Sequence, residues 1–297
     1  MKKIFYLLFF SSFVLFSCQK SVDWSDVDLA GRTSPTPTPP TGGTSGTLLT
    51  KQVIITPSDS AVSNFFWDSK NLLTRYTSIA TDAGDIEALQ YDLMRNASGG
   101  LIKVVQKPML INNTSGIPDS IVKVFYYNPT NTSQLACIKS SGYDAGVVSN
   151  DSIALSYNAS GKCTSVTRYT WVTSFLAYSK SEYTYTGNNI TGVKISMIDG
   201  STGALMPIYD VQSNYDSNKN PYAAFSFIEL LAFDEETYFG DNNLIKTILK
   251  ELLLTGTTIT QEFTGIKFNS FKQPLEADLK VTSGTTSATY KAFYTYK

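Results

Sequence analysis

The sequence has no histidine among its 297 residues. This absence excludes the Ser-His-Asp and Cys-His nucleophile systems, histidine zinc sites and the commonest general base near neutral pH. Charge of either sign is also scarce and balanced, with 24 basic and 25 acidic residues and no basic block. A nucleic-acid partner is therefore not expected, and an enzyme would have to work with carboxylates or lysine alone.

The apolar run at the N-terminus is too short to span a membrane as a helix. After Lys2 and Lys3, the apolar run Ile4–Phe16 has 13 residues, which fits the roughly 7 to 15 of a secretory signal core and not the ~20 of a spanning helix. Residues 1–17 are therefore predicted to be a signal peptide.

The end of that segment, Leu15-Phe16-Ser17-Cys18, resembles the lipobox of bacterial lipoproteins. The resemblance implies cleavage before Cys18 and a diacylglycerol on its thiol, which would anchor the chain because each buried methylene contributes ~0.8 kcal/mol. Gln19 fits sorting to the outer membrane. Phe16 is bulkier than usual for its position, and an ordinary signal peptide with a chance cysteine is the alternative.

The next segment, residues 18–47, reads as a tether. Its centre, residues 33–43, alternates proline with threonine and ends in two glycines, a composition that favours extended polyproline II followed by flexible chain. The remainder, residues 48–297, has the length of one large all-β domain.

Short runs of Val, Ile, Thr, Tyr and Phe, separated by Asn, Asp, Gly and Ser, fill residues 48–297. At the C-terminus Tyr290, Ala292, Tyr294 and Tyr296 share one face of a strand, as period-two alternation requires. The pattern predicts an antiparallel β-meander of hairpin repeats that forms a large curved sheet or open barrel.

The hairpin unit is clearest in residues 157–166. Gly161-Lys162 suggests a phosphate loop, but that motif needs Gly at Ser156 and Ser or Thr at Cys163, and a helix after it. Residues 67–76 show the same spacing of an aromatic residue, Asp or Asn, and an apolar residue. We therefore interpret residues 157–166 as a turn, in which Gly161 takes a positive φ.

These units resemble the tyrosine-aspartate repeats of bacterial secreted proteins. With the lipobox, the stretches Tyr215-Asp216-Ser217-Asn218-Lys219-Asn220-Pro221-Tyr222 and Phe239-Gly240-Asp241-Asn242-Asn243-Leu244 are similar to uncharacterised lipoproteins of Bacteroidota. The resemblance covers about residues 55–297. It implies an envelope lipoprotein with an extended or barrel-like antiparallel sheet and brings no catalytic residues.

The segment 222–233 breaks the β pattern, since it is apolar at nearly every position. It is predicted to be a short helix that plugs one end of the sheet, and an exposed hydrophobic contact for a partner is the alternative. The pair Glu235-Glu236 could suggest a glycosidase, and more simply ends the plug. Sequence cannot reveal the separation that glycosidase carboxylates need.

Two cysteines remain in the domain. In the repeat alignment, Cys163 occupies the position of Leu135 and Cys137 occupies that of Ser165, so the two cysteines are not at equivalent positions of their strands. A disulfide would require a bulge or a shift in register, and whether the two are bridged is left open.

No catalytic, cofactor or metal residues are identified. Ser60, Ser120 and Ser152 lie in Asp-Ser-apolar triplets that resemble the O-glycosylation acceptor of Bacteroidota, although chance matches are expected in so serine-rich a chain. Trp67 and Trp171 could stack on a glycan, or stabilise the sheet as cross-strand aromatics do.

The sequence as a whole predicts a non-enzymatic, lipid-anchored β protein of the outer membrane that binds a glycan or an envelope protein, or has a structural role. A surface glycan-binding lipoprotein for polysaccharide uptake and a carboxylate-only hydrolase are the alternatives.

Overall fold

The computed structural model describes residues 46–55, 60–82, 85–109, 120–144, 147–171, 174–253 and 256–297. The predicted signal peptide, Cys18 and the tether up to residue 45 lie outside these ranges. Within the described residues, the first strand begins at Leu49.

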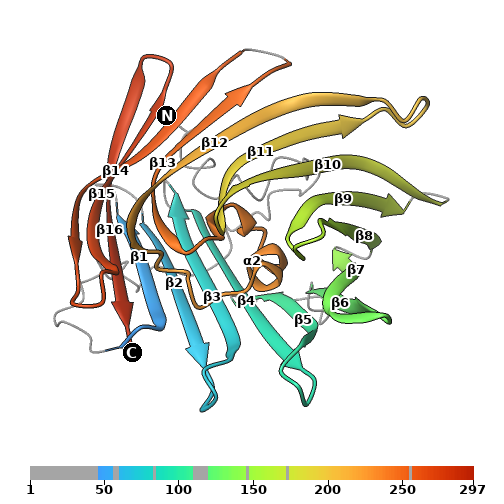
Figure 1. Cartoon of the computed structure of the whole chain (residues 1–297), viewed down its shortest axis with the longest axis horizontal. Helices are drawn as coiled ribbons and strands as arrows, with labels where there is room; N and C mark the ends of the chain where they lie inside the picture. The colour runs from blue at the N-terminus through green and yellow to red at the C-terminus, as the bar shows by residue number, and fades with distance from the viewer. Residues whose placement is uncertain are drawn as a thin grey trace.

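Sixteen antiparallel strands form a closed barrel in which each strand pairs with its neighbours in sequence (Figure 1). The first and last strands close it, with Gln52 opposite Tyr294. This confirms the all-β prediction and settles the choice between an open sheet and a barrel. The strands are β1 (Leu49–Ile55), β2 (Ser60–Trp67), β3 (Leu73–Asp82), β4 (Asp85–Arg95), β5 (Leu101–Pro108), β6 (Ser120–Asn128), β7 (Asn131–Asp144), β8 (Val147–Tyr157), β9 (Cys163–Trp171), β10 (Phe175–Thr186), β11 (Asn189–Ile198), β12 (Leu205–Lys219), β13 (Asn242–Glu251), β14 (Thr258–Phe268), β15 (Pro274–Ser283) and β16 (Thr286–Tyr296).

The core lies inside the barrel. Along β16 the side chains alternate as predicted, so that Tyr290, Ala292, Tyr294 and Tyr296 are buried while Lys291 is exposed. Side chains directly opposite one another in a regular antiparallel pair share a face. Period two therefore carries one apolar face round the barrel and turns the other face outward.

The part of the chain that connects β12 to β13 forms a short plug inside the barrel lumen. It contains α2 (Phe227–Ala232) and the 3₁₀ turn η2 (Glu236–Tyr238), and Figure 1 shows α2 surrounded by the strands. Ser226 begins α2 with a capping box: its hydroxyl accepts from the Glu229 amide, and the Glu229 carboxylate accepts from the Ser226 amide. Leu230, Leu231 and Phe233 are buried, which confirms the predicted plug.

Among the described residues, no helix has the length and apolar character needed to cross a bilayer.

The segments 68–72 and 158–162 form two turns of the same type. Asn158 Oδ1 accepts hydrogen bonds from the amides of Ser160 (3.1 Å) and Lys162 (3.0 Å), and Gly161 has φ +79°. Asp68 Oδ1 accepts from the amides of Lys70 (2.8 Å) and Leu72 (2.9 Å). The side-chain oxygen thus satisfies the backbone of the turn, and the interpretation of residues 157–166 as a turn is confirmed.

Taken in order along the chain, the strands form eight pairs, from β1 with β2 to β15 with β16. At this edge of the barrel, a recurring hydrogen bond joins the two strands within a pair. In seven of the eight pairs, a side chain near the end of the second strand donates to a backbone carbonyl at or near the start of the first. The bonds are Trp67 to Leu49 (2.7 Å), Arg95 to Leu73 (3.0 Å), Tyr127 to Leu101 (3.0 Å), Tyr157 to Leu135 (2.9 Å), Tyr185 to Cys163 (2.8 Å), Tyr215 to Ile190 (2.7 Å) and Tyr296 to Pro274 (2.8 Å).

The stretches 215–222 and 239–244 are not two separate hairpins. Tyr215 and Leu244 are register partners on β12 and β13, just as Tyr157 and Cys163 are partners across the turn described above. The two stretches are therefore the halves of one turn unit, and the plug is inserted between them. Each half keeps its own part of the unit's pattern, which is why each half alone resembles a hairpin turn in sequence.

Cys137 and Cys163 are both free thiols. Cys163 is buried, and burial raises the pKa of its thiol to about 12, so the thiol stays protonated and unreactive. The structure therefore answers the question that the sequence left open.

Candidate functional site

Buried ion pairs hold the plug against the barrel wall. Arg95, at the end of β4, pairs with the Glu229 carboxylate of α2, and both side chains are almost completely enclosed. Arg95 also donates to the Leu73 carbonyl, while the other oxygen of Glu229 accepts from Ser226. Because every partner is hydrogen-bonded, the pair fixes the position of α2 in the lumen.

A second group of contacts fixes the segment that follows α2. Arg168 of β9 donates to Glu236 (Nη2 to Oε1, 3.1 Å) and lies 3.8 Å from Asp234. Tyr183 of β10 donates its hydroxyl to the same Glu236 oxygen (3.0 Å). Lys123 of β6 donates to the Ala232 carbonyl (2.8 Å) and is 3.5 Å from Asp234. The plug is therefore attached to strands on several sides of the barrel.

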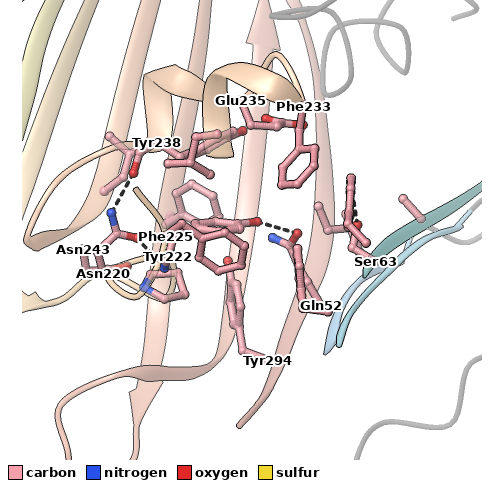
Figure 2. Close-up of a pocket in the computed structure, with 18 of the residues that line it drawn as sticks. Gln52, Ser63, Asn220, Tyr222, Phe225, Phe233, Glu235, Tyr238, Asn243 and Tyr294 are labelled. Carbon is pink, nitrogen blue, oxygen red and sulfur yellow. Dashed lines mark hydrogen bonds between the residues drawn. The ribbon is translucent and has the colours of Figure 1, made fainter. Parts of the chain in front are cut away.

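A cavity of about 60 Å³ lies between the plug and the wall (Figure 2). Its lining is dominated by aromatic rings, with a few polar groups between them, a composition common in small-molecule sites. The rings come from Phe65, Tyr76, Tyr222, Phe225, Phe233, Tyr238, Phe263 and Tyr294, and the polar side chains are Gln52, Ser63, Asn220, Asn243 and Glu235.

The polar groups of the lining are mostly engaged. Tyr222 donates its hydroxyl to Gln52 Oε1 (2.7 Å), and Asn220 donates to the carbonyls of Tyr238 (2.7 Å) and Gly240 (3.0 Å). The rings also pack on one another, since Phe225 contacts Phe65 with centroids 5.1 Å apart. These contacts hold the cavity in one shape without using Glu235.

Glu235 is the carboxyl group among the described residues of this lining. Its Oε2 is enclosed by protein and accepts no hydrogen bond from the described residues. Burial, and then the negative charges of Glu236 and Asp234, raise the pKa of Glu235 well above its ordinary value. Burial also raises the pKa of Tyr76 and of Tyr294 to about 12, so these phenols are neutral at physiological pH.

Glu235 and Glu236 do not form a catalytic pair in this cavity. Glu236 is directed at Arg168 and Tyr183 on β9 and β10, whereas Glu235 lines the cavity. Glycoside hydrolysis needs two carboxyl groups on either side of one bond, and the described part of this lining presents one.

The two tryptophans suggested as ligand-stacking residues lie in different settings. Trp67 is half-buried, donates its indole N–H to Leu49 and packs edge-on against Phe225 of the plug. Trp171 ends β9 and leaves 49% of its surface exposed. The two are therefore not parts of one exposed surface.

The three serines suggested as glycosylation acceptors all lie in strands. Ser60 and Ser120 are the first residues of β2 and β6, and Ser152 is inside β8 opposite Lys139. Ser60 also exchanges a hydrogen bond with the Thr81 hydroxyl (3.2 Å). All three positions are half-buried.

Sequence reasoning missed Arg95, Lys123 and Arg168, although one signal was present. Lys123 stands between Ile121 and Phe125 on the inward face of β6, where the alternation calls for an apolar residue. A cation at such a position predicts a buried acidic partner. Nothing in the sequence says that this partner is in the plug, 111 residues away.

A solved structure shares this architecture. A porin-like protein from Bacteroides uniformis gives a TM-score of 0.54 at 11% identity, over 86% of this chain and 99% of the other. A porin-like protein from Bacteroides vulgatus gives a TM-score of 0.38 at 12% identity, over 84% of this chain and 99% of the other. No protein-family model and no curated protein sequence matches this chain. The first likeness shows a shared barrel fold.

Proposed function

We propose that this protein is a lipid-anchored β-barrel of the bacterial outer membrane that stands in water beside the bilayer and has a binding or structural role, not an enzymatic one. The likeness to a porin-like Bacteroides barrel supports an envelope location. The lipobox-like Cys18 and the proline-rich tether support attachment by a lipid.

The observation that carries this proposal is the charge on the outer wall. Glu182 of β10, Lys194 of β11, Asp210 of β12 and Lys250 of β13 are successive register partners. Their neighbours Tyr183, Val193 and Val211 are buried inside the barrel, so this row of alternating charge faces outward. It crosses the wall near the middle of β10, β11 and β12.

A second row repeats the arrangement. Lys246, Glu262 and Lys280 are register partners on β13, β14 and β15. Other outward pairs are Asp278 with Lys291, and Asp92 with both Arg75 (2.8 Å) and Lys107 (2.8 Å). A lipid-facing barrel wall is an apolar band, and one Lys or Arg at its midplane costs about 2 to 4 kcal/mol. Opposite charges across strands stabilise a wall that faces water.

The plugged lumen supports a role other than conduction. Leu230, Leu231 and Phe233 are buried in its centre, and ion pairs attach the segment to β4 and β9. A general pore would need a polar, water-filled interior.

The anchor and the wall are tested separately. In cells fed an alkyne-labelled fatty acid, we expect the wild type to carry the label and Cys18→Ala to lose it completely, because the thiol is the acylated group. Absence of label from the wild type would refute the anchor.

Exported behind a leader without a lipobox, the barrel should remain soluble without detergent, and a requirement for detergent would refute the water-facing wall.

A glycan-binding role is the second candidate. The exposed ring of Trp171 at the end of β9 supports it, since aromatic faces stack on apolar faces of other molecules. We expect Trp171→Ala to weaken binding on a glycan array by about tenfold, equivalent to ~1.4 kcal/mol. Phe66→Ala, which removes another exposed ring, is the matched control. A wild-type protein that binds no glycan, or binds as well after Trp171→Ala, would contradict this role.

A further inference from the structure

The plug carries more acidic groups than the wall balances. Its segment 226–238 has four carboxyl groups, on Glu229, Asp234, Glu235 and Glu236. The cations of the wall contact three of these four groups: Arg95 pairs with Glu229, Arg168 pairs with Glu236, and Lys123 is near Asp234. The fourth group is Glu235. Among the described side chains, no Lys or Arg lies within ion-pair distance of Glu235.

The surroundings of Glu235 favour a cation of a particular kind. Aromatic rings dominate the lining, and the Glu235 carboxyl group lies near enough to the phenols of Tyr76, Tyr222 and Tyr238 to raise their pKa when it is ionised. Ring faces attract organic cations, most strongly where water is excluded. A hard metal ion instead needs several oxygen ligands, and the described residues include no group of three His, Cys, Asp or Glu side chains placed to hold one.

The size of the space limits the ligand. A cavity of about 60 Å³ has room for a few atoms beyond a single water, which needs ~10 to 15 Å³ on this measure. A sugar ring would require rearrangement of the plug. A methyl-substituted ammonium group is of the right order of size, either free or as the end of a longer molecule.

We propose that the cavity beside Glu235 binds a small organic cation of the methylated ammonium class, with Glu235 as its counter-ion and the aromatic rings enclosing its methyl groups. In such a complex the ammonium group balances the fourth carboxylate of the plug. The rings of Tyr76, Tyr222, Phe233 and Tyr238 supply cation–π and dispersion contacts.

The direct test is isothermal titration calorimetry of the full-length mature protein with trimethylammonium chloride, and with tert-butanol as a neutral molecule of similar shape. We expect saturable binding of trimethylammonium and at least about tenfold weaker binding of tert-butanol, because the charge supplies much of the affinity. Equal binding of the two, or no binding of trimethylammonium, would overturn the proposal.

Glu235→Gln supplies a second test. It should weaken trimethylammonium binding by at least about tenfold, while Glu182→Gln, the same change on the outer wall, should leave binding unaltered. The variant should fold, because an amide removes the cost of burying a charge. If Glu235→Gln binds as tightly as the wild type, Glu235 is not the counter-ion and the proposal fails.

A proton count adds a readout that a merely structural role would not produce. At a pH below the raised pKa of Glu235, the free protein holds a proton there that the bound cation would displace. Titrations in two buffers of different ionisation enthalpy should show release of up to about one proton per ligand in the wild type and none in Glu235→Gln. No wild-type release at a pH below the raised pKa would argue against ionised Glu235 in the complex.

Discussion

Replacing Arg168 by methionine is expected to lower the free energy of unfolding by about 3 to 5 kcal/mol, the range for breaking a buried ion pair. Arg168 is mostly enclosed, donates to Glu236 at 3.1 Å and to the Ser181 hydroxyl at 3.2 Å. Without it, the Glu236 carboxylate stays inside the barrel, and Tyr183 is the hydrogen-bond donor that the described residues still offer it. Urea unfolding followed by circular dichroism measures the loss.

The matched control is Arg75→Met. Arg75 also contacts a carboxylate, Asp92, at 2.8 Å, but half of its side chain is exposed on the outer wall, and such surface pairs contribute about 0 to 1 kcal/mol. The double variant Arg168→Met/Glu236→Gln should recover part of the loss, since it removes the stranded charge. Similar losses for Arg168→Met and Arg75→Met would show that the plug pair is not stabilised in the way we describe.

Truncating Phe225 to alanine is expected to cost about 3 to 5 kcal/mol, as is typical of buried phenylalanines. Phe225 precedes α2 and packs against three rings at once: Phe65 at 5.1 Å, Trp67 at 5.2 Å and Tyr222 at 5.6 Å. Its removal would leave a hole between the plug and β2. Thermal or urea unfolding would report the change.

Phe66→Ala is the control for this prediction, because Phe66 is on the same strand as Phe65 but leaves 47% of its surface exposed. Surface changes of this kind are usually within about 0.5 kcal/mol. A cost for Phe225→Ala as small as that for Phe66→Ala would mean that the plug is not packed tightly against the wall.

Much of this architecture could be predicted because its signals are local. The alternation of Tyr290, Ala292, Tyr294 and Tyr296 depends on the two-residue period of a strand. The turn at Asn158 and Gly161 depends on a side chain that bonds its own backbone and on one positive φ. The apolar segment 222–233 is longer than the turns around it and lacks alternation, which marks it as a different kind of element.

The rest depends on contacts between distant residues. Closure requires Gln52 to meet Tyr294, and alternation is the same in an open sheet as in a barrel. Arg95 and Glu229 are separated by 134 positions, so neither residue identifies the other. Glu235 and Glu236 look equivalent in sequence, yet the backbone directs Glu236 to Arg168 and Glu235 to the cavity.

The hydrogen bond that closes seven of the eight strand pairs, as from Trp67 to Leu49 or from Tyr157 to Leu135, has a consequence for how such barrels change in size during evolution. Donor and acceptor belong to the same pair, so a duplicated or deleted pair carries its whole bond with it. The circumference can therefore change by two strands at a time while every remaining pair keeps its closure. The plug uses the same freedom, because it lengthens one connection between pairs and breaks none of these bonds.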